Sequence, residues 1–409
     1  MARTEASACG LCLAFGFMTQ DPQSMTSSSH GQTVIPAGSR LTIDPLAIAR
    51  NWRRVKDQLM PGTQCAAAVK ADAYGCGLAV TVKHLAEAGC SAFFVATPQE
   101  GVTARQAAPG AVIYILNGLF PGAAPLLTEA RLRPVLGSLP EIEEWALFCR
   151  ERKVKLEAAI HINTGMNRLG LNAPECERLA ADQLLLEAFT PSLLMSHLAC
   201  AAEPAHPMNK AQLAAFEAMS AYFPGVPRSL ANSAGVFLGP EFHFDLVRPG
   251  IALYGGQIID HPPMKLETVV RLEARVLQVR KVPAGEGVGY GLARTAERDS
   301  RIAMISCGYG DGFLRGAGSA DGKPGASAWV DGHPLPLFGR ISMDMLAVDA
   351  TDVPADKLRR GAYVELLGPN ASLQAAASAA GTIDYELLTG LGRRHERVYG
   401  PLDSGTTGD

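Results

Sequence analysis

Apolar runs of strand length alternate with longer stretches of helical period from residue 41 to about residue 265. Stretches rich in Ala, Leu and Glu, such as Leu78–Ala88 and Ala211–Tyr222, separate most of these runs. Eight strands that alternate with helices predict an α/β fold, a (β/α)8 barrel of the TIM type, rather than an open sheet. We expect the eight strands at Cys65–Val69, Ala92–Thr97, Val112–Asn117, Arg133–Leu136, Leu156–Ile162, Leu193–His197, Ser229–Asn232 and Val247–Leu253.

The pattern changes after about residue 268, where short β-type runs are separated by Gly, Pro and Asp. This spacing predicts a C-terminal, mostly-β domain with a short helix near Ser372–Ala380. We expect a barrel over 40–267 and a β domain over 268–400, with a polar tail at 401–409. Residues 1–39 lie outside the pattern and are expected to be a flexible extension or the product of too early a start codon. The expected β runs are Val269–Val279, Ser300–Ser306, Ala328–Val330, Met345–Val348 and Ala362–Leu366.

Of the 409 residues, 47% are hydrophobic and 19% are charged, and the formal net charge is −3, as in a soluble globular enzyme. Nucleic acid is not expected as a partner, and no apolar run reaches the length of a membrane span. Nine cysteines without a spaced framework favour reduced thiols and a cytoplasmic location. The periplasm is the alternative if residues 1–39 hold a signal peptide. Cys9 and Cys12 form a C-x-x-C without a second pair, so no metal site is expected.

The strongest chemical signal is a lysine at the end of the first predicted strand. The apolar run Ala66–Val69 leads into Lys70, and Tyr74, Gly75 and Gly77 follow before the next helical stretch. An apolar setting disfavours the ammonium form and lowers the pKa of a lysine, as a Schiff-base nucleophile requires. The glycines permit a sharp turn at the strand end, where such barrels place their chemistry. The alternative is a lysine whose amine merely extends into solvent.

The segment V-K-A-D-A-Y-G-C-G at 69–77 resembles the pyridoxal-phosphate lysine motif of the alanine racemase family. Later segments match the family in the right order, and the resemblance runs from about Leu41 to about Tyr399. These segments are H-I-N-T-G-M-N-R-L-G (161–170), S-H-L-A (196–199), A-N-S-A-G (231–235), V-R-P-G-I-A-L-Y-G (247–255), G-V-G-Y-G (287–291), G-Y-G-D-G (308–312), G-R-I-S-M-D (339–344) and T-I-D-Y-E (382–386). The resemblance implies a homodimeric isomerase that uses pyridoxal 5'-phosphate to interconvert L- and D-alanine and supplies D-alanine for peptidoglycan.

Racemisation needs two bases, because one side chain cannot remove and return protons on both faces of the α-carbon without moving. The resemblance implies Lys70 as the base on one face. It implies Tyr290, reaching in from the partner subunit, as the base on the other. The ordinary tyrosine pKa of about 10 is high for a base at neutral pH, so a cation must stabilise the phenolate, and Arg168 is the candidate. On its own, a Gly-Tyr-Gly segment is more often a turn.

The implied cofactor site lies at the ends of the last two predicted barrel strands. Ser233 follows strand seven, and Gly250 and Ile251 lie within or after strand eight, where TIM barrels favour phosphate groups. The resemblance implies that these residues bind the cofactor phosphate together with Tyr74 and Tyr385. Taken alone, the Ser233 hydroxyl has an ordinary alternative as a turn cap.

Arg248 is implied to face the pyridine nitrogen of the cofactor. Because arginine keeps its proton, that nitrogen would stay unprotonated. The ring would then be a weaker electron sink, which favours simple reprotonation over transamination. His197, at the end of strand six, is implied to pack at the ring and to bond Arg248. A surface arginine before a proline turn and a core histidine are the alternatives.

The same resemblance implies a substrate site. Arg168 and the backbone N–H of Met343 are implied to lie near the substrate carboxylate. Tyr309 and Asp344 are implied to form a narrow entrance that admits small side chains. For Met343 the alternative is an ordinary core methionine, although the implied role needs only its backbone.

His161 and Asn163 depart from the family pattern. Many relatives carry a carbamylated lysine at the first position and an aspartate at the second. Histidine cannot carry that carbamate, so another group must orient Arg168. We expect a bound anion, such as chloride, beside Arg168 and Asn163, because the arginine is otherwise uncompensated.

Other functions fit parts of the pattern. A broad-specificity racemase that also acts on serine or larger residues would use the same two bases and differ only in pocket size. A decarboxylase of the same two domains would not need the opposed tyrosine. A non-enzymatic barrel that only binds pyridoxal phosphate would end before residue 268. The sequence leaves the substrate breadth and the choice between a biosynthetic and a catabolic role open.

Overall fold

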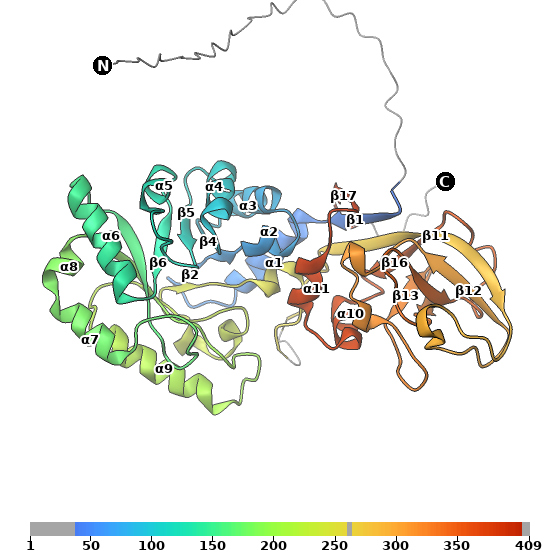
Figure 1. Ribbon diagram of the computed structural model, residues 1–409. Helices are drawn as coiled ribbons and strands as arrows, with labels where there is room; N and C mark the ends of the chain where they lie inside the picture. The colour runs from blue at the N-terminus through green and yellow to red at the C-terminus, as the bar shows by residue number, and fades with distance from the viewer. Residues whose placement is uncertain (1–36, 260–263, 403–409) are drawn as a thin grey trace, which may run out of the picture. The chain divides into compact units, whose positions relative to one another are not determined.

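The computed structural model describes residues 37–259 and 264–402, so most of the predicted extension and tail lie outside the described residues. Seven parallel strands pair with one another in chain order (Figure 1). Most of their residues are buried, because both faces of a barrel strand are covered by other side chains. The strands are β3 (Ala67–Ala68), β4 (Ala92–Val95), β5 (Val112–Ile115), β6 (Arg133–Leu136), β7 (Glu157–His161), β8 (Thr190–Met195) and β9 (Arg228–Ser229).

Strand β10 (Leu246–Val247) closes the ring by pairing in parallel with β2 (Gln64–Cys65). Strand β2 overlaps the predicted first strand at Cys65, and β3 lies within that strand. On the other side of β10, the Arg248 N–H donates to the Ala231 carbonyl oxygen over 2.9 Å, which joins β10 to the segment after β9. The predicted barrel is therefore confirmed.

The eighth strand is shorter than the sequence predicted. Residues Ile251–Tyr254, most of which were expected as strand, form the 3-10 helix η3. Pro249 has no N–H to donate to a ladder, and Gly250 lies far from strand geometry with φ −125° and ψ −89°. The Leu253 N–H then donates to the Gly250 carbonyl oxygen over 2.8 Å and starts the helix. The turn leaves backbone N–H groups at the carboxyl end of the barrel.

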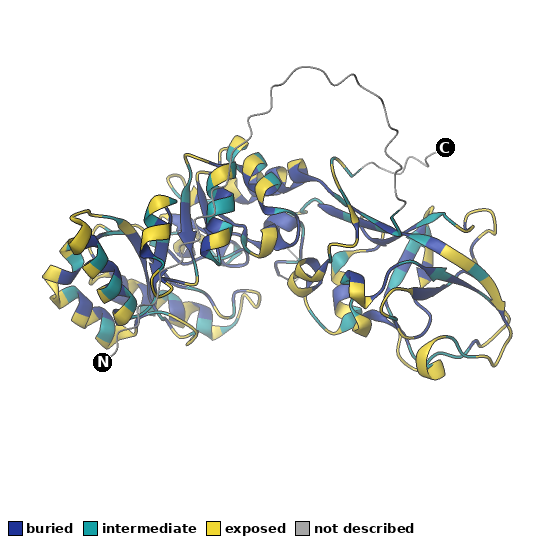
Figure 2. Ribbon diagram, turned by 45° about the horizontal axis from the view of Figure 1, so that its top comes forward, coloured by how far each residue is buried: buried dark blue, intermediate teal, exposed yellow. Residues whose placement is uncertain are grey.

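Helices cover the outside of the barrel, and side-chain caps set where several of them begin. The carboxylate of Asp44 caps α1 over 2.9 Å, and the Thr97 hydroxyl caps α4 in a reciprocal capping box with Glu100. In Figure 2 the barrel strands are dark blue, whereas the outward faces of the helices are yellow. The helices are α1 (Pro45–Lys56), α3 (Leu78–Glu87), α4 (Pro98–Ala107), α5 (Ala124–Glu129), α6 (Leu139–Arg152), α7 (Ala173–Ala181), α8 (Gln183–Glu187) and α9 (Pro207–Ser220).

Two groups of buried side chains hold the barrel together. The larger group lies between strands and helices and extends into the C-terminal domain. The smaller group fills the ring, and in it Phe94 and Tyr114 stack with their ring centroids 4.8 Å apart. Alternate residues of a strand point to opposite faces, so each strand contributes to both groups. The smaller group comprises Ala66, Ala92, Phe94, Tyr114, Val135, Ala159, Leu193, Met195 and Leu246.

The C-terminal domain is built around one long strand, β11 (Val270–Val282), which pairs with three neighbours. The predicted β runs are all present, and the predicted helix is α10 (Leu373–Ala380). Three further strands and α-helices were not predicted, because they are short and their sequences show no clear period: β14 (His333–Pro336), α11 (Asp384–Gly390) and β17 (Glu396–Tyr399). The other strands are β12 (Ser300–Ile305), β13 (Ser327–Val330), β15 (Leu346–Asp349) and β16 (Tyr363–Leu367).

Strand β1 (Ser39–Ile43) differs from the expectation that residues 40–267 form the barrel. It lies in the sheet of the C-terminal domain, antiparallel to β11 and parallel to β17. Buried and half-buried residues alternate along it, as in a strand with one covered face. The chain therefore starts its described part in one domain and enters the barrel at α1. The boundaries at 40 and 268 stay predictions.

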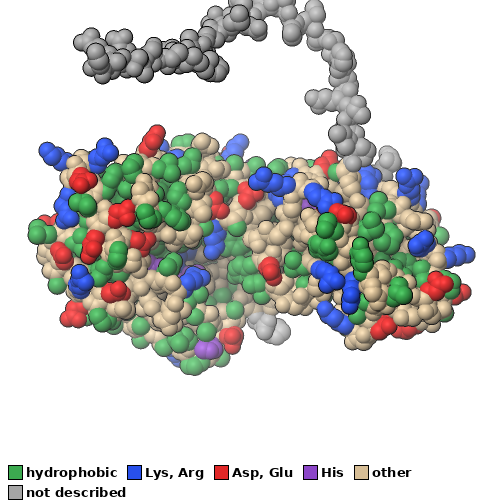
Figure 3. Space-filling view, viewed as in Figure 1, with side chains coloured by type: hydrophobic (Ala, Val, Ile, Leu, Met, Phe, Trp, Pro, Cys, Tyr) green, Lys and Arg blue, Asp and Glu red, His purple; other side chains and the backbone are tan. Residues whose placement is uncertain are grey.

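Basic and acidic side chains are interspersed over the face shown in Figure 3. An extended basic surface of the kind that binds nucleic acid is not visible on this face. In the part of the chain that the structure describes, every helix is too short or too polar to cross a membrane.

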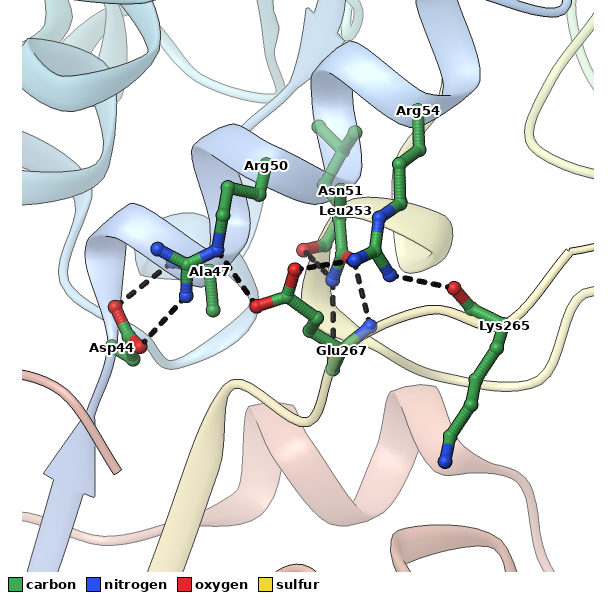
Figure 4. Close-up of polar contacts among 8 residues, drawn as sticks. All are labelled: Asp44, Ala47, Arg50, Asn51, Arg54, Leu253, Lys265 and Glu267. Carbon is green, nitrogen blue, oxygen red and sulfur yellow. Dashed lines mark hydrogen bonds and ion pairs between the residues drawn. The ribbon is translucent and has the colours of Figure 1, made fainter. Parts of the chain in front are cut away.

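A polar cluster fixes the linker that leads from the barrel into β11 (Figure 4). The Glu267 carboxylate accepts hydrogen bonds from Arg50 over 2.8 Å and from Arg54 over 2.7 Å. The buried Asn51 amide donates to the carbonyl oxygens of Glu267 (2.9 Å) and Leu253 (3.2 Å), and its oxygen accepts from the Glu267 N–H over 2.8 Å. The Asn51 side chain of α1 thus forms hydrogen bonds with three backbone groups, two of Glu267 and one of Leu253.

We expect Asn51→Ala to lower the free energy of unfolding by about 2–4 kcal/mol, because it leaves these buried backbone groups without partners. Urea unfolding followed by tryptophan fluorescence measures the change. Arg53→Ala is the control, since Arg53 is exposed on the same helix. Equal midpoints for the two variants would show that Asn51 does not hold the linker.

Candidate active site

Lys70 lies just beyond strand β3, at the carboxyl end of the barrel, as the sequence predicted. The chain still follows β4 at the preceding residue, because the Val69 N–H donates to the Phe94 carbonyl oxygen over 2.9 Å. Burial lowers the pKa of Lys70, the Arg168 cation lowers it further, and Glu100 opposes both. A lowered pKa makes the neutral, nucleophilic amine more abundant at neutral pH.

The backbone after Lys70 makes an unusual left-handed turn. Residues Ala71, Asp72, Ala73 and Tyr74 all have φ 54°, a conformation that costs an L-residue about 1–2 kcal/mol. Runs of such residues persist only where the surroundings enforce them, and they concentrate at functional sites. The turn buries the Tyr74 ring beside the strand that carries Lys70.

Contacts from several elements hold this turn. The Ala71 N–H donates to Glu100 of α4 over 2.6 Å. The Gly75 carbonyl oxygen accepts from Arg397 of β17 over 2.6 Å, so the C-terminal sheet also fixes the turn. The Asp72 carboxylate accepts from the Leu78 N–H at the start of α3 over 2.7 Å.

Ser233, Gly250 and Tyr74 come together in a cradle with the η3 turn. The buried Ser233 hydroxyl accepts from the N–H groups of Gly250 (2.8 Å) and Ala252 (3.3 Å). A Cβ atom on Gly250 would collide with the Tyr74 hydroxyl oxygen, so only glycine leaves this position open. Ile251 begins η3 between these two N–H groups. Hydroxyl and backbone N–H donors in one place form a site for an anion.

Three tyrosines border the cradle. Tyr74 stacks on Tyr254 with ring centroids 4.5 Å apart, and the Tyr385 ring of α11 lies 5.9 Å from Tyr74. Burial raises the pKa of Tyr74, and it raises the pKa of Tyr385 to about 12. Both phenols therefore stay protonated at neutral pH and can donate to an anion. The structure brings together Tyr74, Ser233, Gly250, Ile251 and Tyr385, and their binding of a cofactor phosphate stays a prediction.

Arg248 is buried next to the same strand ends. Its guanidinium donates to the Ser229 hydroxyl, and to the carbonyl oxygens of Ser196 over 2.5 Å and Leu230 over 3.5 Å. It lies over the Phe94 ring, 5.8 Å from the centroid. Burial lowers the pKa of Arg248 to about 9, so the side chain remains a cation at neutral pH.

His161 and His197 follow from the neighbouring strand ends, and both are neutral. Burial first, then Arg248 and Arg168, lower the pKa of His161 to about 4. The same causes, with Lys70 in addition, lower the pKa of His197 to about 3. The hydrogen bonds of Arg248 run to Ser196 and its other partners rather than to the His197 ring. The bond between His197 and Arg248 therefore stays a prediction.

These groups define what the site can do. Lys70, Arg168 and Arg248 are cations, and Glu100 is the acidic side chain that acts on the Lys70 pKa. A phosphorylated carbonyl compound fits this arrangement, because the cradle can bind its phosphate while the amine attacks its carbonyl carbon. Within residues 37–259 and 264–402, no three His, Cys, Asp or Glu side chains gather where a metal ion could bind.

The chain matches the family description "Alanine racemase, N-terminal domain" over residues 43–258 and "Alanine racemase, C-terminal domain" over residues 269–399. The chain belongs to the alanine racemase family.

Individual relatives agree with this assignment. An alanine racemase from Methylobacterium sp. (strain 4-46) is 49% identical over 364 residues, which cover 89% of this chain and 98% of the relative. One from Rhodospirillum rubrum is 45% identical and covers 90% of this chain and 98% of its own length. The crystal structure of alanine racemase from Bartonella henselae with covalently bound pyridoxal phosphate is similar with a TM-score of 0.84. It shares 40% identity and covers 89% of this chain and all of its own.

Four further predicted site residues of this alanine racemase family member, Tyr290, Tyr309, Met343 and Asp344, lie in the C-terminal domain. Tyr290 is 70% exposed, and Met343 is 54% exposed. Within the described residues, no hydrogen bond or ion pair joins Tyr290 to Lys70. That these two residues act as a pair of bases therefore stays a prediction.

Tyr309 and Met343 are held side by side by two loops of the C-terminal domain. The Tyr309 N–H donates to the Ser342 carbonyl oxygen over 3.0 Å, and the Gly310 N–H donates to the Met343 carbonyl oxygen over 2.8 Å. The adjacent Asp344 accepts from Arg394 over 2.8 Å. The three residues predicted near the substrate in this domain are thus neighbours.

Arg168 and Asn163 lie on the loop after β7, and Arg168 is exposed. The Asn163 oxygen accepts from the N–H groups of Gly165 (3.1 Å) and Asn167 (3.0 Å), and its amide donates to the Asn167 oxygen over 2.9 Å. Asn163 therefore shapes its own loop. The neutral His161 supplies no negative charge, and an anion beside Arg168 stays a prediction.

Sequence reasoning missed two residues of this site. Tyr254 supports the Tyr74 ring and donates to the Ala68 carbonyl oxygen over 3.1 Å, but its place in an apolar run gave no sign of this. Glu100 contacts the turn after Lys70, and here a signal existed. Thr97 and Glu100 have the spacing of a capping box, which predicts a carboxylate fixed near a strand end.

We expect His161 and His197 to remain neutral down to about pH 5, and side-chain ¹⁵N NMR measures this directly. Their folded-state pKa values of about 4 and 3 lie below the ordinary 6.5. At pH values between these limits, the unfolded chain therefore binds more protons than the folded chain. The free energy of unfolding should therefore fall as the pH drops below about 6.5. The variants His161→Gln and His197→Gln assign the signals. A midpoint near 6.5 for either ring would contradict its buried, cation-facing setting.

Proposed function

We propose that this chain is an alanine racemase that uses pyridoxal 5'-phosphate to interconvert L- and D-alanine. The observation that carries the proposal is an amine and an anion cradle at the same end of one barrel. The Ala68 N–H donates to the Pro249 carbonyl oxygen over 2.8 Å, which sets the strand of Lys70 directly against Gly250. The bound pyridoxal phosphate named for the Bartonella relative supports the choice of cofactor.

The residues of the cradle would hold the cofactor phosphate, and Lys70 would hold the cofactor covalently. When bound, pyridoxal phosphate supplies an electron sink that makes the α-hydrogen of the amino acid acidic. The close approach of the Gly250 backbone to the Tyr74 hydroxyl and the protonated hydroxyls of Tyr74 and Tyr385 fit a phosphate. The holding residues would be Tyr74, Ser233, Gly250, Ile251 and Tyr385.

Lys70 would take and return the proton on one face of the α-carbon. Burial and the Arg168 cation, which lower its pKa, increase the fraction of neutral amine that can accept this proton. Arg168 would also bind the substrate carboxylate, together with the backbone N–H of Met343.

Arg248 would face the ring nitrogen and keep it unprotonated, since the guanidinium remains a cation at neutral pH. His197 and His161 are neutral, so neither would add a proton there. This arrangement limits how much negative charge can leave the α-carbon, so reprotonation competes well with transamination.

Tyr290 would serve the opposite face from the partner subunit of a homodimer. The C-terminal domain carries further exposed apolar side chains, including Leu292, Tyr309 and Met343. A face of this kind is suited to contact with a second copy of the chain. Tyr309 and Asp344 would narrow the entrance, which favours alanine. In the cell, the enzyme would work in the cytoplasm and supply D-alanine for peptidoglycan.

The proposal is tested by incubating the purified chain with pyridoxal phosphate and single enantiomers of alanine, serine, lysine and arginine, followed by chiral chromatography. We expect racemisation of alanine in both directions and loss of it in Lys70→Ala. Comparable rates with serine or larger amino acids would favour the broad-specificity alternative. Absence of racemisation with every amino acid would exclude a racemase.

We expect Tyr290→Phe to retain the visible absorbance of the cofactor while kcat falls about 10²- to 10⁴-fold, the range for loss of an acid–base group. Mixing this variant with Lys70→Ala, after subunit exchange, tests where Tyr290 acts. If sites are shared, half of the dimers are mixed and each holds one intact site, so about a quarter of the activity returns. Without recovery, Tyr290 does not act across subunits.

A further inference from the structure

Glu100 ties two barrel loops together with one carboxylate. One oxygen accepts from the Ala71 N–H over 2.6 Å. The other accepts from the N–H groups of Ala96 (2.8 Å) and Thr97 (3.2 Å), which precede α4. Because Thr97 also caps α4 in a capping box with Glu100, the position of this carboxylate is fixed by its own helix.

The bond to Ala71 falls at a critical place. Ala71 is the first residue of the left-handed turn and the one that directly follows Lys70. Four successive L-residues in this conformation cost roughly 4–8 kcal/mol together, so the turn needs bonds that its right-handed alternative would lose. The Glu100 bond is such a contact, and it acts one peptide unit from the reactive lysine.

We propose that Glu100 is a positioning residue that fixes the direction of the Lys70 side chain by holding the Ala71 N–H. It does not touch the substrate or the cofactor in this role. The significance of Lys70 as the reactive amine rests on the proposed function, but the bond and its effect on Lys70 can be measured without turnover.

Electrostatics gives Glu100 a second effect on the same amine. Burial and the Arg168 cation on the loop after β7 lower the pKa of Lys70, and the Glu100 carboxylate on α4 raises it. His197, after β8, also faces Lys70 but is neutral. Removal of the Glu100 charge should therefore lower the pKa of Lys70.

The chain contains a matched control in α6. Glu141 accepts from the Leu119 N–H over 2.9 Å and from the Gly137 N–H, before its own helix, over 2.9 Å. It bridges two neighbouring loops as Glu100 does, but Lys70 lies on neither of them. A purely structural role for such glutamates predicts similar effects at both positions.

The first experiment measures the Lys70 pKa in the full-length chain after hydroxylamine has removed any bound pyridoxal phosphate. Amine labelling with trinitrobenzenesulfonate is followed against pH by peptide mass mapping, with the exposed Lys83 as an internal reference. In Glu100→Gln, the midpoint for Lys70 should fall by about 0.5 unit or more, a change of about threefold in free amine below the midpoint. Glu141→Gln should leave it unchanged. Equal midpoints in Glu100→Gln and the unchanged chain would overturn the electrostatic part of the proposal.

Hydrogen exchange of the peptide that spans residues 69–77 tests the positioning part. Glu100→Gln and Glu100→Asp should both raise exchange at Ala71 at least tenfold, because a shortened or uncharged side chain cannot hold both loops. Glu100→Asp keeps the charge and is the second variant if Glu100→Gln fails to fold. Unchanged exchange in Glu100→Asp would overturn the proposal.

Kinetics links the two measurements to catalysis. In Glu100→Gln we expect kcat for alanine racemisation to fall about tenfold with KM within about twofold, and Glu141→Gln to keep both values. A drop in kcat of similar size in Glu141→Gln would show that Glu100 has only a structural role. If the chain does not racemise alanine at all, the labelling and exchange results still decide whether Glu100 positions Lys70.

Discussion

Backbone hydrogen bonds between the first and last barrel strands determine where the candidate active site lies. The N–H groups of Gln64, Ala66 and Ala68 donate to the carbonyl oxygens of residues 245, 247 and 249 over 2.8–2.9 Å. This register brings Lys70 and Gly250 to the same end of the ring, although 180 positions separate them (250 − 70). Because parallel strands all end on one face, the other barrel residues of the site arrive there by the same rule. A slip of the register would separate the amine from the anion cradle.

Charge is distributed unevenly around this end of the barrel. The cations Lys70, Arg168 and Arg248 act on this end of the barrel. Together with burial, the arginines lower the pKa values of His161 and His197, so both rings stay neutral. Such a site is costly while empty of anions, since like charges repel and burial weakens their hydration. A phosphate or a carboxylate would relieve both effects, so these cations favour the binding of an anionic ligand.

The barrel could be predicted from the sequence because its strands are apolar on both faces and its helices have a clear period. Ser233, Gly250 and Ile251 could be placed because they lie within or after the last two predicted barrel strands, whereas Tyr385 was named only through resemblance. Strand β17 and helix α11 escaped prediction, since short polar segments gain their structure from neighbours such as β1 and Tyr74 rather than from local pattern. The pairing of β1 with β11 joins residues that are far apart in the sequence, and composition does not reveal such a pairing. Tyr290 could be named only through resemblance. Its side chain is exposed in the single chain, and within the described residues no contact marks it as part of a site.

The pairing of β1 on both sides has a consequence for biosynthesis. Arg40 of β1 forms an ion pair with Glu396 of β17 across 356 positions, and the Ser39 hydroxyl bonds the His395 ring over the same separation. A ribosome releases the N-terminal partner of these contacts long before the C-terminal one. The barrel can collapse during translation, whereas the strand that precedes it must wait for β11 to pair with one edge and for β17, near the end of the chain, to pair with the other. An exposed strand of this kind invites association with other nascent chains, so the interval before its capture is a natural point for chaperones to act.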